Sequence, residues 1–191
     1  MKLLLTLSLL LGFFFFGCDQ GSDLSSPVSD SPNSNVKLIS IPAPIGGLSI
    51  EALLTKYQKI DGDDGGRFAA YFGYEGGIFG YVKVESILTF EEDAFEEIQI
   101  ISQTLDTEYA AMKFGPSMQF EEDVKLDLIM KGLDLSDVDL GTLDFVYIDE
   151  DGTIEQVEYD NLTADVYSGT IELDNAVLTH FSRYGFVNGQ E

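Results

Sequence analysis

The chain has almost none of the side chains that bind transition metals or form disulfides. Its 191 residues include one cysteine, Cys18, one histidine, His180, and no tryptophan. A single cysteine cannot form an intramolecular disulfide. One cysteine and one histidine are also too few for a zinc site built from those ligands. We expect no cofactor.

Positive charge is scarce as well. Ten Lys and Arg residues stand against 34 Asp and Glu residues, which gives a formal net charge of −24. A protein that binds a nucleic-acid backbone needs a basic surface that releases counterions, so this composition excludes nucleic acid as a partner. The same charge repels the folded part of the chain from anionic lipid headgroups and favours solubility.

The only long apolar run lies at the N-terminus. Lys2 precedes about 14 apolar residues, fewer than the roughly 20 that a membrane-spanning helix needs. Gly17 and Cys18 end the run, so residues 1–17 resemble a bacterial lipoprotein signal peptide, although Phe15 and Phe16 depart from its usual pattern. The resemblance implies cleavage before Cys18 and attachment of fatty acids such as palmitate to it. The alternative is an ordinary cleaved signal followed by an incidental cysteine.

Residues 18–36 have little to bury. They are rich in Ser, Asp, Pro, Gly and Asn, a composition typical of a flexible tether. Hydrophobic residues make up 45% of the whole chain and aromatic residues 12%, so the remaining residues, 37–191, can bury a core as one domain.

Residues 37–191 read as β structure. Strand-like runs and turn signals alternate every eight to twelve residues or so, which is typical of a sandwich. Strands are expected over Val36–Ile41, over the alternating run from Val124 to Met130, and over one long stretch, Ala176–Val187, that is apolar on both faces. A helix over Ser49–Lys59 competes with a strand over Thr55–Ile60. The predicted fold is an all-β, antiparallel β-sandwich.

Residues 65–187 or so resemble the ZU5-type β-sandwich of bacterial secreted and lipid-anchored proteins. Three segments carry the resemblance: Lys113–Phe120 (KFGPSMQF) with the VKLDL strand after it, the turn Asp149–Gly152, and Thr179–Tyr184 (THFSRY). Leu88–Phe95 departs from the family, whose members carry a Pro-Pro-Gly-Ala turn there. The resemblance implies a fold and an extracytoplasmic location but no ligand.

Acidic residues gather in pairs and in turns. The pairs Glu91-Glu92, Glu96-Glu97 and Glu121-Glu122 are expected to be solvated, because neighbours along a strand point to opposite faces and do not form a catalytic carboxylate pair. Aspartates in Gly-containing turns are candidate calcium ligands, although neither group follows an EF-hand pattern and Asp-Gly also simply turns a chain. These candidates are Asp61, Asp63, Asp64, Asp149 and Asp151.

His180 and Ser182 are the candidate catalytic pair. The resemblance implies that Ser182 could attack the carbonyl of Phe181 with His180 as general base, which would cleave the Phe181–Ser182 bond. In a regular strand the two residues are two steps of about 3.3 Å apart, whereas a general base must come within roughly 2.6–3.2 Å. A buried Phe181 opposite His180 favours a straight strand, so we expect the bond to stay intact.

Together these features predict a non-enzymatic lipoprotein, anchored through Cys18 to a membrane of the cell envelope on its extracytoplasmic side. Its role would be binding, adhesion or scaffolding, with an envelope or extracellular protein or glycan as partner. A self-cleaving module is the main alternative, and an envelope hydrolase acting through carboxylates is a third.

Overall fold

A computed structural model describes residues 36–45 and 54–189. The predicted signal peptide (1–17), Cys18, nearly all of the tether and residues 49–53 of the competing helix lie outside the described residues. No helix forms within these ranges, so they contain none long and apolar enough to cross a membrane.

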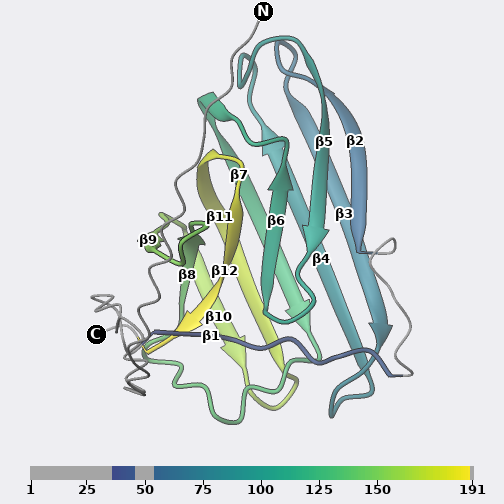
Figure 1. The fold of residues 1–191 in the computed structure, drawn as a ribbon, viewed down its shortest axis with the longest axis vertical. Helices are drawn as coiled ribbons and strands as arrows, with labels where there is room; N and C mark the ends of the chain where they lie inside the picture. Colours follow the sequence, from purple (N-terminus) through teal and green to yellow (C-terminus); the bar gives the residue numbers. More distant parts are fainter. Residues whose placement is uncertain (1–35, 46–53, 190–191) are drawn as a thin grey trace, which may run out of the picture. The chain divides into compact units, whose positions relative to one another are not determined.

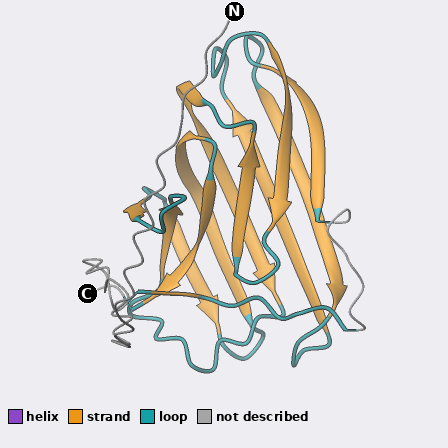
Figure 2. Ribbon diagram, viewed as in Figure 1, coloured by secondary structure: helices purple, strands orange, loops and turns teal. Residues whose placement is uncertain are grey.

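The described residues form twelve strands (Figure 2). These are β1 (Lys37–Leu38), β2 (Thr55–Asp61), β3 (Gly66–Glu75), β4 (Tyr81–Phe90), β5 (Ile98–Leu105), β6 (Ala111–Gly115), β7 (Gln119–Lys131), β8 (Asp144–Ile148), β9 (Ile154–Gln156), β10 (Asn161–Asp165), β11 (Thr170–His180) and β12 (Arg183–Asn188).

The strands build two antiparallel sheets that pack face to face (Figure 1). The seven-stranded sheet has the order β2-β5-β6-β12-β8-β9, with β1 paired to β12, and the five-stranded sheet has the order β10-β11-β7-β4-β3. The predicted all-β, antiparallel β-sandwich is therefore confirmed.

The core lies between the sheets and follows the period of two expected for half-buried strands. In β7, Val124, Leu126, Leu128 and Met130 are fully buried, whereas Lys125 on the same strand is only partly buried. This confirms the alternation predicted for that strand. Full burial of each such side chain stabilises the fold by about 1.5–3 kcal/mol.

The region for which a helix and a strand were both predicted forms a strand from Thr55 onward. β2 pairs with β5 along its whole length, from Thr55 opposite Thr104 to Asp61 opposite Ile98. The helix would place Tyr57 on its apolar face, but in β2 its side chain is 69% exposed. For the described residues the helix prediction is wrong, because pairing with β5 outweighs the local helical spacing.

The two end strands also differ from the prediction. Of Val36–Ile41, only Lys37 and Leu38 form a strand. The amide of Ile39 still donates a hydrogen bond to the carbonyl of Phe186, and its carbonyl accepts one from the amide of Ala110. The single strand over Ala176–Val187 is wrong, because β11 ends at His180 in one sheet and β12 begins at Arg183 in the other. Both faces of this stretch are apolar because the chain crosses the core between the sheets.

Candidate functional site

The candidate catalytic triplet occupies the crossing between the sheets. The amide of Phe181 donates to the carbonyl of Met118, and the amide of Phe114 donates to the carbonyl of Ser182, both at 2.8 Å. These bonds tie the triplet to both arms of the turn between β6 and β7. The segments 113–120 and 179–184, which carried the family resemblance, therefore lie side by side. We call His180–Ser182 and its contacts the junction.

Phe181 holds the junction in the core. Its side chain is 1% exposed, as predicted. Its ring contacts three others: Phe120 edge-on with centroids 4.7 Å apart, Phe114 stacked at 5.7 Å, and Phe90 edge-on at 6.2 Å. Such pairs contribute beyond the area that they bury. Burial of this ring did not require the straight strand that we expected.

His180 is held by its neighbours rather than by Ser182. Its ring packs edge-on against Tyr147, with centroids 4.7 Å apart, and its Nδ1 lies 3.1 Å from the Thr179 hydroxyl. The Tyr184 hydroxyl donates to the carbonyl of His180 at 2.7 Å. Burial raises the pKa of the Tyr184 phenol, and nearby Tyr147 and Glu155 raise it further, so this donor keeps its proton at neutral pH.

Tyr147 borders the junction through its contacts with His180 and Tyr184. The pKa of the Tyr147 phenol is raised, first by burial and then by its hydrogen bond to Asp149, whereas a hydrogen bond with Ser182 lowers it. The phenol donates its own proton to Asp149, at 3.0 Å. Within the part of the chain that the structure describes, no hydrogen bond joins the side chains of His180 and Ser182. Cleavage would require the two side chains to come together.

A hollow of about 320 Å³ lies beside His180. Tyr147, Tyr184, Asp123 and Glu155 line it with the histidine. Carboxylates thus lie near the ring, as in hydrolytic sites, but neither is hydrogen-bonded to it among the residues described.

The candidate calcium ligands stay in separate turns. Asp61, Asp63 and Asp64 lie at the turn between β2 and β3, and Asp149 and Asp151 at the turn between β8 and β9. Hydrogen bonds from the Thr153 hydroxyl and amide lower the pKa of Asp151, so this carboxylate already shapes its own turn. Among the described residues, no group of three or more Asp, Glu, His or Cys side chains is arranged to hold a metal ion.

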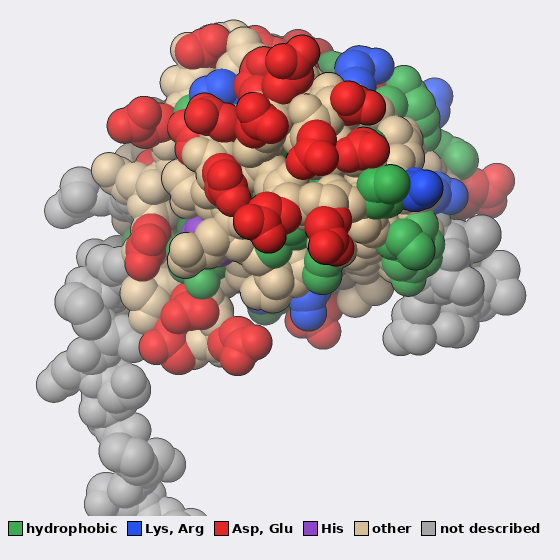
Figure 3. Space-filling model, turned by 90° about the horizontal axis from the view of Figure 1, so that it is seen from above, with side chains coloured by type: hydrophobic (Ala, Val, Ile, Leu, Met, Phe, Trp, Pro, Cys, Tyr) green, Lys and Arg blue, Asp and Glu red, His purple; other side chains and the backbone are tan. Residues whose placement is uncertain are grey.

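The paired glutamates are exposed, as predicted. Those at 91–92 and 96–97 lie in the loop between β4 and β5, and those at 121–122 lie at the start of β7. The amide of Glu121 donates to the carbonyl of Ala94 at 2.9 Å, which brings these segments together. Figure 3 views the molecule from above and shows acidic side chains over this surface.

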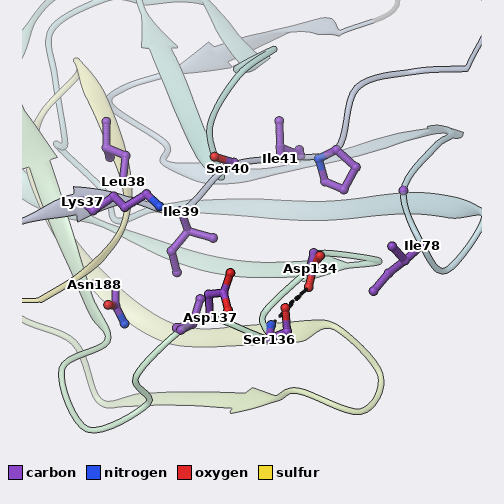
Figure 4. Close-up of a pocket in the computed structure, with 13 residues that line it drawn as sticks. Lys37, Leu38, Ile39, Ser40, Ile41, Ile78, Asp134, Ser136, Asp137 and Asn188 are labelled. Carbon is purple, nitrogen blue, oxygen red and sulfur yellow. Dashed lines mark hydrogen bonds between the residues drawn. The ribbon is translucent and has the colours of Figure 1, made fainter.

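A groove of about 380 Å³ runs beside the N-terminal segment (Figure 4). Lys37, Ile39 and Ile41 lie along one side, and Asp134 and Ser136 from the loop after β7 lie on the other. Both the amide and the hydroxyl of Ser136 donate to Asp134, at 3.2 and 2.8 Å, and these bonds lower the pKa of Asp134. The side chains of Asp134 and Ser136 therefore satisfy one another.

One feature escaped the sequence reasoning. The outer face of the five-stranded sheet carries two exposed tyrosines, Tyr71 and Tyr81, beside Lys83 and Lys131. The outward positions of β3 and β4 can be read from their alternation with buried residues such as Phe72 and Val82. The sequence therefore indicated which side chains of β3 and β4 point outward. It did not indicate that β7 lies beside β4, because that pairing joins residues far apart in the sequence.

Comparison with known proteins finds no matching family model, no similar curated protein and no similar solved structure. Only the residues of this chain can support a functional proposal.

Proposed function

We propose that this protein is a lipid-anchored, non-enzymatic binding domain of the cell envelope, built on a ZU5-like β-sandwich. The observation that carries the proposal is the position of the only cysteine. Cys18 directly follows the apolar run and Gly17, the one place where lipidation requires it. More than one acyl chain gives stable attachment to a membrane, where a single chain does not.

The tether and the charge support display away from the membrane. A flexible coil of the tether's length, about 17 residues, spans roughly 20–25 Å on average. The acidic domain, part of a chain with net charge −24, is repelled by anionic headgroups. Its surfaces would therefore be free to meet an envelope or extracellular protein or glycan.

The junction geometry favours binding over catalysis. His180 Nδ1 lies 3.1 Å from the Thr179 hydroxyl, and among the described residues no hydrogen bond joins its side chain to that of Ser182. The exposed carboxylates lie at turns and strand ends, where they favour solubility.

Fractionation of cells tests the anchor. The unaltered protein should be in the membrane fraction and should incorporate label from a fed fatty acid, whereas Cys18→Ala should move it to the soluble fraction without label. Ser25→Ala, also in the tether, is the matched control and should change neither result. A soluble, unlabelled wild-type protein would show that the anchor is wrong.

Self-cleavage is the second candidate function, and the bend at the junction is the observation that favours it. The crossing between the sheets provides the departure from a straight strand that such chemistry needs. The Ser182 hydroxyl would give its proton to His180 and attack the Phe181 carbonyl carbon. The C–N bond would break, the Ser182 nitrogen would take the proton, and water would hydrolyse the resulting ester to a Phe181 carboxylate and a new N-terminus at Ser182.

A C-terminally tagged chain on a denaturing gel tests this candidate. We expect the tag to stay on the full-length band in both wild type and Ser182→Ala. A small tagged fragment in wild type that is lost in Ser182→Ala would make self-processing the function.

A further inference from the structure

The outer face of the five-stranded sheet carries a cluster that the fold itself does not use. Tyr71 comes from β3, Tyr81 and Lys83 from β4, and Ile129 and Lys131 from β7, and we call these five residues the tyrosine–lysine face. The side chains of Tyr71 and Tyr81 are 60% and 43% exposed. A hollow of about 420 Å³ lies among them.

Gly73 makes room for this hollow. A Cβ atom at Gly73 would lie 2.7 Å from the Tyr81 hydroxyl oxygen and 2.9 Å from its Cε1, so the Tyr81 ring lies over the glycine. Glycine inside a strand weakens it and often marks a site where another group approaches closely. The strand thus gives up stability where it lets an aromatic ring lie close to the sheet.

The two lysines are a pair of like charges. Lys83 lies directly opposite Lys131 in the register of β4 and β7. Like charges directly opposite each other destabilise a sheet. Residues 36–45 and 54–189 contain one ion pair, Arg183 with Asp106, so within these residues neither lysine forms an ion pair with a carboxylate. Lys83 Nζ lies 5.6 Å from the centre of the Tyr81 ring instead. Two like charges side by side, neither in an ion pair among the described residues, favour an anionic ligand.

Polar groups continue the surface across the sheet. A second hollow, of about 500 Å³, lies on the other side of Lys131 and is lined by Thr163, Thr170 and Glu172 among others. Lys131 borders both hollows. Glu85 lines the first hollow, so carboxylates that accept hydrogen bonds flank the lysines on both sides.

We infer that the tyrosine–lysine face binds an acidic oligosaccharide. The exposed tyrosine rings offer flat apolar surface to sugar rings, the lysine pair matches sugar carboxylates, and Glu85, Thr170 and Glu172 match sugar hydroxyls. An acidic peptide would match the lysines but leave the tyrosine rings and carboxylates without matching groups. This inference rests on the proposed binding function and names the ligand class and its surface.

Calorimetric titration tests the inference with the full-length protein as cells produce it, in mild detergent. The first probe is tetragalacturonate, and its methyl ester is the matched neutral probe. We expect saturable binding of the acid and about tenfold weaker binding of the ester, the change that 1.4 kcal/mol produces. Tyr81→Ala should weaken acid binding by about tenfold as well, within the contribution typical of an aromatic contact. Lys83→Gln with Lys131→Gln should abolish the preference for acid over ester.

The matched controls lie on the other sheet. Tyr57 is 69% exposed on β2 and Lys59 is also exposed there, so Tyr57→Ala and Lys59→Gln should leave binding unchanged. Equal weakening by the controls, or no weakening by Tyr81→Ala, would overturn the inference.

Two further probes, a hyaluronan tetrasaccharide and sialyllactose, extend the test. No binding of any of the three acidic sugars overturns the inference, and binding of poly-glutamate alone would assign the face to an acidic peptide instead. Membrane fractionation of the same preparation keeps the two claims separate, because a membrane-bound, labelled protein without sugar binding leaves the anchor intact.

Discussion

The junction and the tyrosine–lysine face use aromatic rings in opposite ways. At the junction, Phe181 is 1% exposed and contacts three phenylalanine rings, whereas on the face Tyr71 is 60% exposed. The rings at the junction are buried in the core and stabilise the fold, whereas the rings on the face remain exposed and can contact a ligand. The contacts of the junction thus explain its residues without a catalytic role. The tyrosine–lysine face, which matches no known motif, has no comparable role in the fold.

The largest expected effect comes from emptying the junction. Phe181→Ala should lower the free energy of unfolding by about 3–5 kcal/mol, because it leaves a cavity among rings that cannot close it. Urea denaturation measures the change. Tyr167→Ala, at a side chain that is 95% exposed, is the control and should change stability by no more than about 0.5 kcal/mol. Equal losses of stability in Phe181→Ala and Tyr167→Ala would contradict the structural difference between buried and exposed rings.

A smaller effect is expected from the hydrogen bond that closes the junction. Tyr184→Phe removes the donor to the His180 carbonyl and should cost about 0.5–1.5 kcal/mol, the net contribution of a typical hydrogen bond. Tyr57→Phe is the matched control on an exposed tyrosine and should be neutral. Unchanged urea midpoints for Tyr184→Phe would mean that this bond does not hold the bend.

Alkaline pH should distinguish tyrosines that are shielded from solvent from tyrosines that are exposed. Burial raises the pKa of Tyr74 and of Tyr159 to about 12 from the ordinary 10.0, with Asp144 adding to the shift of Tyr159. The unfolded chain therefore loses these protons first, so their contribution is fully present below pH 10 and is lost as pH rises toward 12. Urea midpoints should fall over this interval, and less steeply in Tyr74→Phe. A flat profile would contradict the burial of these phenols.

The smallest expected effect on stability lies on the face itself. Tyr71→Ala and Tyr81→Ala together should lower the free energy of unfolding by about 1 kcal/mol or less, since the two residues are 60% and 43% exposed. Thermal melting measures this change. A loss as large as that of Phe181→Ala would give these tyrosines a structural role and end the comparison.

Much of the fold follows from local pattern. The buried alternation of β7 and the turn at Asp149–Gly152 were predicted from residues that are neighbours in sequence, and both are confirmed. The crossing at Phe181 was not, because a stretch that is apolar on both faces fits either one strand buried on both sides or a chain that changes sheets. The choice is made by distant partners, Met118 and Phe114.

The candidate sites divide along the same line. The sequence located His180 and Ser182, but not the packing of Tyr147 against the His180 ring. It likewise contained Tyr81 and Lys83, but only the pairing of β4 with β7 brings Lys131 opposite Lys83. Sequence pattern thus identifies residue types, whereas which of them meet depends on strand register.

The intact mass of the protein purified from membranes and fully denatured tests the central claim most directly. The account predicts one species, the chain from Cys18 to Glu191 with the added mass of its acyl chains. A species of bare polypeptide mass would contradict the anchor. A pair of masses divided between Phe181 and Ser182 would contradict the structural role of the junction.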